Sequence, residues 1–330
     1  MKVLLLGKLR SVCRWVEDIA EDLTLAGHIV HLMPYRDIRI HKSIERLMLW
    51  PAIGAPLAVA IARRMHRLAP DLVLAIGPFQ WFPPALFQHL SQVRSRPPMI
   101  AWIGDMFTEQ AASIAALFDA VAYTDSGLVA LHNRFGFRPP AAYVPLAASR
   151  SLAALAGPHA AWASHLAFVA TPTEQRRAML AGMADPVDVF GPGWQHASGL
   201  AQHERSGRRV GPAELLDIYD SHLGVLNIRH EVNVLNGLNQ RHFAPYVLGR
   251  PVVTDAQPDV TRCFEPGHEM LVYRHVEELN EIYARLQRNP DLACRIGVAG
   301  RRRVLAQHTY AHRLDTIAAL AGIKDQHMET

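Results

Sequence analysis

The sequence predicts an α/β protein made of two doubly wound domains, each a parallel sheet covered by helices. Its 330 residues exceed what one compact core usually holds, since domains most often run to about 100 to 200 residues. Short apolar runs alternate with segments of helical periodicity, which is typical of parallel strands joined by right-handed crossovers. That alternation stops once, between residues 148 and 162, and then begins again.

The first half opens with an apolar run that Gly7 closes, followed by apolar residues at helical spacing up to Gly27. The same alternation then continues to residue 144. The predicted strands of this half are 3–6, 28–33, 71–76, 99–102, 120–123 and 142–144. Its predicted helices are 12–25, 57–68, 111–118 and 127–135.

An interdomain linker is predicted over 148–162, which is rich in Ala, contains Gly157-Pro158 and lacks a strand pattern. The predicted domains are therefore 1–150 and 163–330, with a last helix that can return to the first domain. Strands of the second half are predicted at 166–170, 187–190, 223–228, 251–254 and 271–273. Its helices are predicted at 174–183, 212–219, 240–248 and 276–286.

Composition indicates a folded protein with an anionic partner. Half of the residues are hydrophobic and 19% are charged, a balance that argues against disorder. The net charge of +4 and the pI of about 9.1 favour phosphorylated small molecules or acidic lipids, without indicating nucleic acid. The three cysteines, Cys13, Cys263 and Cys294, are scattered and form no CxxC motif. We therefore expect a reducing, cytoplasmic compartment.

No cofactor and no metal are expected. His308 and His312 lie four apart on a predicted helix, but they lack the Glu of a zinc-protease motif and a third ligand nearby. No Asp-x-Asp sequence occurs, so the acidic pair that usually holds a divalent cation beside a diphosphate is missing. An anionic ligand would then be bound by arginines and helix ends.

One apolar stretch, 47–62, is shorter than the roughly 20 residues that span a bilayer, so no transmembrane helix is expected. The apolar run at the N-terminus is too short for a signal peptide. Basic residues flank the stretch: Arg36, Arg39, Lys42 and Arg46 before it, Arg63 and Arg64 after it. Two interpretations stay open, a core helix beside solvated arginines or a basic amphipathic segment in peripheral contact with the inner membrane surface.

A candidate anion site lies at 168–177, where a strand runs directly into a helix. We expect Thr171 as the N-cap, with Glu174 completing a capping box. The free N–H groups near Thr173 and the charges of Arg176 and Arg177 would attract a phosphate. The alternative is an ordinary solvated first turn.

A second polar segment, 226–243, passes from a strand through a loop rich in Asn and Gly into a helix. Asn236, Gly237 and Asn239 can present N–H groups to a diphosphate, and the guanidinium of Arg241 can neutralise a leaving diphosphate. The alternative is a polar loop with a surface arginine.

Other candidate residues follow strand ends in each half. In the turn 190–194, Gly191 and Gly193 would let the backbone approach a flat ligand that Trp194 flanks, although turn geometry alone would also explain these glycines. In the first half, Asp105 follows a strand as a candidate acid or base or a helix cap, and Gly7 and Arg10 follow the first strand.

Five segments of the second half form a recognisable set: FGPGW (190–194), LNI (226–228), RHFAPYVLGRPVVTD (241–255), FEPGHE (264–269) and VLAQHTYAHR (304–313). The set resembles the GT-B glycosyltransferases grouped with CgeB-type spore maturation proteins. The first half is similar more loosely, through 69–75, 102–105 and 143–147.

The resemblance implies two Rossmann-like domains facing a cleft and a metal-independent, hexosyltransferase-like enzyme. The second domain would bind a nucleoside diphosphate sugar, and the first an acceptor that is a saccharide, lipid-linked or a protein. Expected catalytic residues are Asp105 and Arg241, with Gly7 and Arg10 on the acceptor side. Expected donor-binding residues are Thr173, Arg176, Arg177, Gly191, Gly193, Trp194, Asn227, Asn236, Gly237 and Asn239.

The sequence departs from the family at a glutamate thought to grip the donor ribose, where this chain has Ala244. The position eight residues earlier, acidic in many related transferases, is Asn236. Ribose recognition then falls to other groups, such as Glu231 or the main chain. Ala244 favours one alternative function, a catalytically silent GT-B protein that acts as partner or scaffold of an active transferase. A nucleotide-sugar epimerase ranks last, because its added carboxylates are not found.

Overall fold

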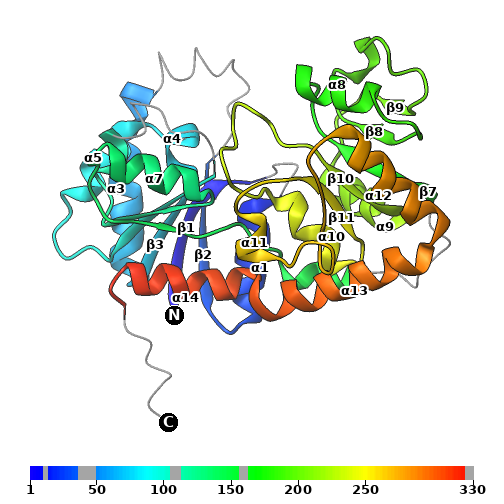
Figure 1. Ribbon diagram of the computed structural model, residues 1–330. Helices are drawn as coiled ribbons and strands as arrows, with labels where there is room; N and C mark the ends of the chain where they lie inside the picture. The colour runs from blue at the N-terminus through cyan, green and yellow to red at the C-terminus, as the bar shows by residue number, and fades with distance from the viewer. Residues whose placement is uncertain (10–13, 36–49, 105–112, 156–162, 324–330) are drawn as a thin grey trace. The chain divides into compact units, whose positions relative to one another are not determined.

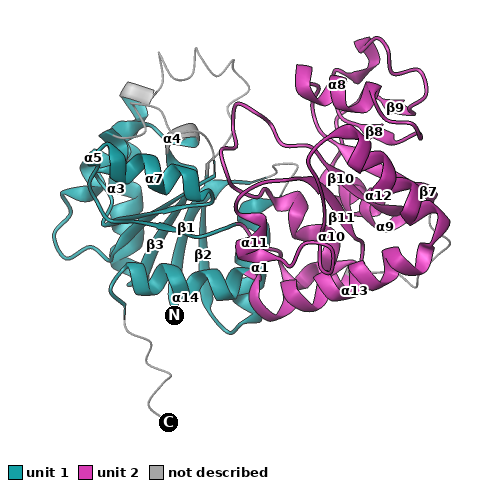
Figure 2. Cartoon of the chain, viewed as in Figure 1, with its two compact units in different colours: residues 1–145, 310–330 teal, residues 146–309 magenta. Residues whose placement is uncertain are grey.

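The computed structural model describes residues 1–9, 14–35, 50–104, 113–155 and 163–323 (Figure 1). These residues form two compact units, which Figure 2 distinguishes by colour. Unit 1 comprises Met1–Pro145 and Tyr310–Thr330, and unit 2 comprises Leu146–Thr309. The chain thus leaves unit 1 after Pro145 and re-enters it at Tyr310, with its last helix.

Unit 1 is built on a parallel sheet with the strand order β2-β1-β3-β4-β5-β6 in the described residues. Its strands are β1 (Lys2–Lys8), β2 (Ile29–Tyr35), β3 (Leu72–Ile76), β4 (Met99–Ile103), β5 (Ala120–Tyr123) and β6 (Ala141–Tyr143). Its helices are α1 (Trp15–Leu25), α3 (Trp50–Leu68), α4 (Pro78–Trp81), α5 (Pro84–Ser91), α7 (Ser126–Arg134) and α14 (Tyr310–Leu320). The central strands are apolar throughout because helices cover both faces of the sheet.

Unit 2 is built on a second parallel sheet, with the order β12-β11-β10-β7-β8-β9. Its strands are β7 (Ala163–Val169), β8 (Asp188–Phe190), β9 (Arg205–Ser206), β10 (His222–Asn227), β11 (Val252–Asp255) and β12 (Leu271–Tyr273). Its α-helices are α8 (Glu174–Ala181), α9 (Pro212–Ser221), α10 (Ala244–Val247), α11 (Val260–Cys263), α12 (Val276–Arg288) and α13 (Pro290–Gln307). Short 3₁₀ helices are η2 (Arg150–Leu155), η3 (Trp194–His196) and η4 (Gln240–His242).

The strand order of unit 2 reverses between its two central strands. From β7 the chain moves outward to β8 and β9, then returns to β10 and moves outward the other way. The loops that follow β7 and β10 therefore diverge at the carboxyl ends of these strands, the place where doubly wound sheets generally bind ligands in a crevice. We refer to this region of unit 2 as the crevice.

The predicted α/β class and every predicted strand are confirmed, with ends that differ by up to three residues. Several details were wrong. The single helix expected over 240–248 is divided into η4 and α10, because Phe243 separates them. The segments β9, α4, α5 and most of α13 were missed. His308 and His312 do not share a helix, since α13 ends at Gln307 and α14 begins at Tyr310.

The structure also bears on metal binding and on membrane spanning. Within the residues that the structure describes, no group of three His, Cys, Asp or Glu side chains has the geometry to hold a metal ion. In the same residues, no helix combines the length and the apolar character that crossing a membrane requires.

Helix α13 is attached to unit 2 through two glycines. A Cβ on Gly297 would lie 2.0 Å from the carbonyl oxygen of Gly249, and one on Gly300 would lie 2.2 Å from the ring of Tyr246. The hydroxyl of Tyr246 in turn accepts a hydrogen bond from the N–H of Val252 at the start of β11. The close approach of α13 thus supports the connection between α10 and β11.

Gly297→Ala should lower the free energy of unfolding of unit 2 by about 1 to 3 kcal/mol, because the added methyl group overlaps a backbone atom. The sign is informative, since alanine normally stabilises a helix interior by about 1 kcal/mol relative to glycine. Urea denaturation followed by circular dichroism measures the change. Val298→Ala, at an exposed position of the same helix, is the control and should leave stability almost unchanged. Equal stability of both variants would contradict the close approach.

Candidate functional site

Arg176 occupies the crevice from the β7 side. It lies in the first turn of α8, and the Oγ1 of Thr173 caps this helix by accepting the Arg176 N–H at 3.3 Å. The predicted cap, Thr171, is wrong: it contributes a carbonyl oxygen that accepts from Arg176 Nη1 at 2.9 Å. Nε of the same side chain donates to the carbonyl oxygen of Ile228, just beyond β10, at 3.1 Å.

Arg241 enters the same crevice from the β10 side. Its Nε donates to Oδ1 of Asn227 at 3.1 Å, and its Nη1 donates to the carbonyl oxygen of Val169 at 2.8 Å. Arg176 thus follows β7 in the chain and donates a hydrogen bond just beyond the end of β10. Arg241 follows β10 and donates a hydrogen bond to the end of β7. Within the described residues, the Nη2 atoms of Arg176 and Arg241 have no hydrogen-bond partner.

A buried network fixes Arg241. Oδ1 of Asn227 also accepts from Asn239 Nδ2 at 3.1 Å, while Asn227 Nδ2 donates to Oγ1 of Thr254 at 3.2 Å. The N–H of Asn239 donates to His242 Nδ1 at 3.0 Å, and His242 Nε2 lies 2.9 Å from the Thr254 hydroxyl. The structure therefore corrects two expectations. Asn227 is fully buried, and the Asn239 N–H expected to face a diphosphate is taken by His242.

The two guanidinium groups repel each other across the crevice. Burial, and next the charge of Arg241, lower the pKa of Arg176 to about 10, so it still carries its proton at neutral pH. Arg176 is only 3% exposed. In the described residues, no carboxylate forms an ion pair with Arg176 or Arg241. The crevice therefore has an excess of positive charge that an anionic ligand would balance.

The nearest acidic groups are engaged elsewhere. Asp255, at the end of β11, accepts from the N–H of Arg229 at 2.9 Å and lies 3.4 Å from Nε of the Arg229 side chain. Burial raises the pKa of Asp255, while these contacts with Arg229 oppose the shift. Glu231 is exposed, and its Oε2 accepts from the hydroxyl of Thr173 at 3.1 Å. Glu231 thus lies at the mouth of the crevice, beside the start of α8.

The three predicted residues in the turn after β8 make internal packing contacts and hydrogen bonds. The prediction that Trp194 flanks a ligand is wrong, because its side chain is completely buried and Nε1 donates to the carbonyl oxygen of Ala170 at 2.6 Å. Gly191 has a φ of +125°, and a Cβ there would lie 2.2 Å from that same carbonyl oxygen. Gly193, with a φ of +96°, packs against Pro172. These residues hold the loop that leads from β7 to α8.

The remaining predicted donor-binding residues are Arg177, Asn236 and Gly237, and the first two form backbone hydrogen bonds within unit 2. Arg177 is exposed, and its N–H donates to the carbonyl oxygen of Thr173. The carbonyl oxygen of Asn236 accepts from the N–H of Asp259 at 3.1 Å, and Gly237 is buried.

On the acceptor side, the structure places one of the three predicted residues. Gly7 is buried in β1, where a Cβ would lie 2.5 Å from a methyl group of Val16, so packing explains this glycine. Arg10 and Asp105 lie outside the described residues.

Sequence reasoning missed His242 and Thr254, which fix Arg241 through Asn227 and Asn239. His242 follows Arg241 directly, but no spacing links it to Thr254, twelve residues away. The pairing of β10 with β11 places Thr254 beside Asn227, and His242 from η4 contacts both side chains.

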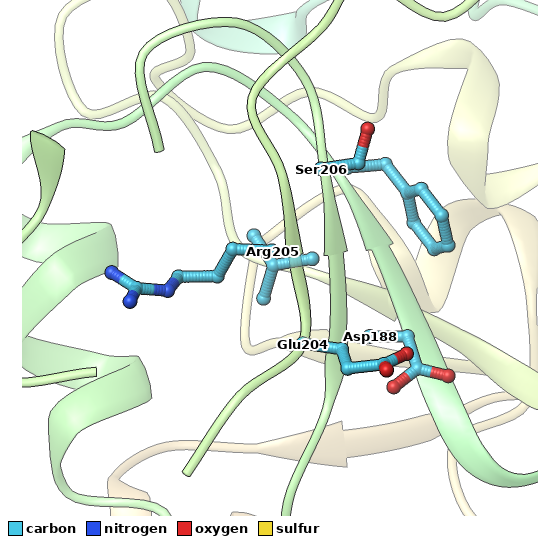
Figure 3. A pocket seen from close by; sticks show the side chains of 6 residues that line it. Asp188, Glu204, Arg205 and Ser206 are labelled. Atoms are coloured by element: carbon cyan, nitrogen blue, oxygen red, sulfur yellow. The ribbon is translucent and has the colours of Figure 1, made fainter. Parts of the chain in front are cut away.

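A hollow of about 240 Å³ lies elsewhere on unit 2, between β8 and β9 (Figure 3). In this view the side chains of Asp188 and Glu204 lie close together, whereas Arg205 extends away from them. Both oxygens of Asp188 are already paired, with His165 Nδ1 at 3.0 Å and His222 Nε2 at 3.1 Å. Two neighbouring carboxylates disfavour a phosphate, so this hollow does not suit an anionic ligand.

Part of the chain matches a known protein family. Residues 167–319 match a family described as glycosyl transferase-like. A comparison with curated proteins finds no match.

Three solved structures resemble the chain over almost its whole length. Sucrose-phosphate synthase from Thermosynechococcus elongatus has 14% identity and a TM-score of 0.64, covering 97% of this chain and 98% of its own. HepE from Anabaena, in complex with UDP and glucose, has 13% identity and a TM-score of 0.65, covering 98% and 99%. AviGT4, a glycosyltransferase involved in avilamycin A biosynthesis, has 16% identity and a TM-score of 0.59, covering 98% of each chain.

The fold is therefore GT-B, in which each of two parallel α/β sheets forms its own unit. The segment that matches the glycosyl transferase-like family, 167–319, contains both Arg176 and Arg241.

The buried imidazole of His242 predicts how stability depends on pH. Burial lowers the pKa of His242 to about 3, and the charge of Arg241 acts in the same direction. The unfolded chain therefore takes up a proton that the folded chain does not. The stability that His242 contributes is complete above its ordinary pKa of 6.5 and is lost as the pH falls toward 3.

We expect the unfolding free energy to fall below pH 6.5, with a contribution from His242 of up to about 1.4 kcal/mol per pH unit. His242→Gln cannot ionise, so it should be less stable at pH 7 and lose stability less steeply on acidification. Urea denaturation between pH 7 and 4 measures both slopes. The exposed His196→Gln is the control. Parallel slopes for wild type and His242→Gln would show that His242 is not held neutral.

Proposed function

We propose that this protein is a glycosyltransferase that moves a sugar from a nucleoside diphosphate sugar to an acceptor, without a metal ion. One observation carries the proposal. Arg176 and Arg241 meet at the strand-order reversal of unit 2, each held through Nε and Nη1 and each with its Nη2 unbonded in the described residues. A diphosphate matches this pair, because two phosphate groups present several acceptor oxygens and at least two negative charges.

The arginines can act on the leaving group of such a transfer. When the bond between sugar and diphosphate breaks, negative charge develops on the departing phosphate oxygen. Fixed guanidinium groups stabilise that charge without reorganising, and removing one such donor typically costs enzymes about 3 to 4 kcal/mol. The start of α8, capped by Thr173, adds a positive dipole end next to Arg176. Together these groups would do what a divalent cation does elsewhere.

The comparisons support a nucleotide-sugar donor. HepE, which shares the fold, was crystallised with UDP and glucose and with UDP-glucose. The family that matches 167–319 is described as glycosyl transferase-like. We further propose that the donor sugar is a hexose, that the protein is related to the CgeB-type transferases, and that it is located in the cytoplasm.

The acceptor side of the proposal depends on unit 1. Asp105 follows β4 in the sequence, and carboxylates beyond strand ends of such sheets commonly act as bases. We propose that Asp105 orients or deprotonates the acceptor hydroxyl. The acceptor itself is a saccharide, a lipid-linked molecule or a protein.

A catalytically silent GT-B partner protein is the second candidate, and Ala244 favours it. Ala244 begins α10 and is buried, so the position that the family resemblance assigns to a ribose-binding glutamate offers no carboxylate here. A silent protein would bind a nucleoside diphosphate but would not turn over a donor. Binding and turnover therefore have to be measured separately.

Nucleoside diphosphates should bind in the presence of EDTA. A thermal-shift panel of nucleotides and nucleotide sugars identifies the ligand, and calorimetry in EDTA gives its affinity. Arg241→Gln should weaken binding by about tenfold or more, the loss expected for a charge-assisted hydrogen bond. Arg285→Gln, on the exposed side of α12, is the matched control. Loss of all binding on chelation would contradict the metal-free diphosphate site.

Arg241→Ala should reduce turnover by at least about tenfold, since its charge is needed most as the diphosphate departs. Release of nucleoside diphosphate from the donor found in the panel measures the rate, and the circular dichroism spectrum checks the fold. A rate equal to that of the wild type would remove Arg241 from the mechanism. Binding by the wild type without any turnover would favour the silent partner.

A further inference from the structure

Helix α3 of unit 1 exposes a face without polar side chains over its first three turns. Between Trp50 and Ala62 the helix has no polar side chain at all. On its solvent side lie Ala52, Pro56, Val59 and Ala60, all exposed, and Val59 has 52% of its surface accessible. A surface helix normally carries polar groups on this side.

The opposite side of α3 is packed in the core of unit 1. Ala58, Ile61 and Met65 are buried, and α3 lies beside α5 (Figure 1). The two helices approach so closely that a Cβ on Gly54 would lie 2.7 Å from the Cβ of Ala85. The exposed apolar side chains are therefore additional to the core of unit 1.

Basic side chains continue the exposed face of α3 in its last turns. The last turns of α3 expose Arg63, His66 and Arg67, and in the described residues neither arginine has an ion-pair partner. From Trp50 to Gly104 the sequence contains five arginines and a single acidic residue, Asp71. One of these arginines, Arg96, is neutralised by Asp119. The surface around α3 therefore stays basic.

We propose that the exposed face of α3 binds the surface of an anionic lipid bilayer. An apolar strip continued by arginines is typical of helices that lie in the interface plane, with the strip against acyl chains and the cations among anionic headgroups. Among the side chains that the structure describes on this face, Ala52, Pro56, Val59 and Ala60 are small, and none is an aromatic anchor of the kind that dominates protein–protein interfaces. A bilayer needs no such anchor, which favours lipid over an acidic protein.

This inference goes beyond the proposed transfer reaction and does not depend on it. It also gives the enzyme access to lipid-linked acceptors, one of the acceptor classes that the sequence leaves open. The two claims can fail separately, because vesicle binding is measured without any nucleotide.

Co-sedimentation of the full chain with vesicles tests the proposal. Vesicles of phosphatidylcholine alone are compared with vesicles containing phosphatidylglycerol, at low and high salt. We expect binding only to the anionic vesicles, and weaker binding as salt screens the charges. Arg63→Gln and Arg67→Gln should each reduce the partition coefficient about fivefold, the effect of one cation near an anionic surface. The double variant Arg63→Gln/Arg67→Gln should combine both losses.

Two further variants separate charge from apolar contact. The control Arg285→Gln/Arg288→Gln removes the same charge from α12 of unit 2 and should bind vesicles like the wild type. Val59→Ser leaves the charge intact and should weaken binding severalfold without changing its salt dependence. Equal recovery in the supernatant with neutral and anionic vesicles at low salt would overturn the proposal. So would equal losses in the α3 and α12 double variants, because binding would then follow net charge alone.

Discussion

Two positive charges held close together without a carboxylate between them are the constraint on which the candidate site depends. Proteins normally neutralise a buried guanidinium with an acidic partner, because an uncompensated buried charge is costly. Here Arg176 is buried against carbonyl oxygens of Thr171 and Ile228, and Arg241 against that of Val169. Carbonyl dipoles solvate both cations but leave their net charge in place. The crevice therefore keeps an attraction for anions that an ion pair would have cancelled.

The neutral residues around Arg241 serve the same purpose. Asn227 accepts the hydrogen bond of Arg241 Nε, a role that an aspartate could fill with similar geometry. A carboxylate there would compete directly with a phosphate for the guanidinium. His242 is likewise kept uncharged by burial and so adds no third positive charge beside Arg241. The network thus orients Arg241 without altering the charge that the crevice presents to a ligand.

The fold could be predicted from the sequence because the patterns that specify each strand and helix are local. Alternating apolar runs and helical periodicity predicted both sheets, since the central strands are buried on both faces and helices such as α1 and α12 on one. The arginines were also found from local context, as charges following strand ends. The sequence could not show which polar groups already form hydrogen bonds within the protein. Asn239 and Trp194 looked available for a ligand, yet each is bonded to a residue brought near by strand pairing or by a turn. Thr173 is the cap in place of Thr171 because α8 begins at Glu174, two residues later than a cap at Thr171 requires.

Ala244 concerns the ribose contact that the family resemblance implies, and it lies outside the network that holds Arg241. It begins α10, three residues beyond Arg241, but its side chain is buried and takes no part in the network that holds Arg241. The missing carboxylate would remove hydrogen bonds to ribose hydroxyls, a loss of about 1.5 to 3 kcal/mol for a charged acceptor. That loss corresponds to a donor bound about 10 to 150 times more weakly, with the groups that stabilise the leaving diphosphate unchanged. Glu231, which is exposed and accepts a hydrogen bond from the Thr173 hydroxyl, is a carboxylate beside the start of α8. Under the proposed function, weaker binding of the nucleoside together with an unchanged pair of arginines is therefore compatible with transfer.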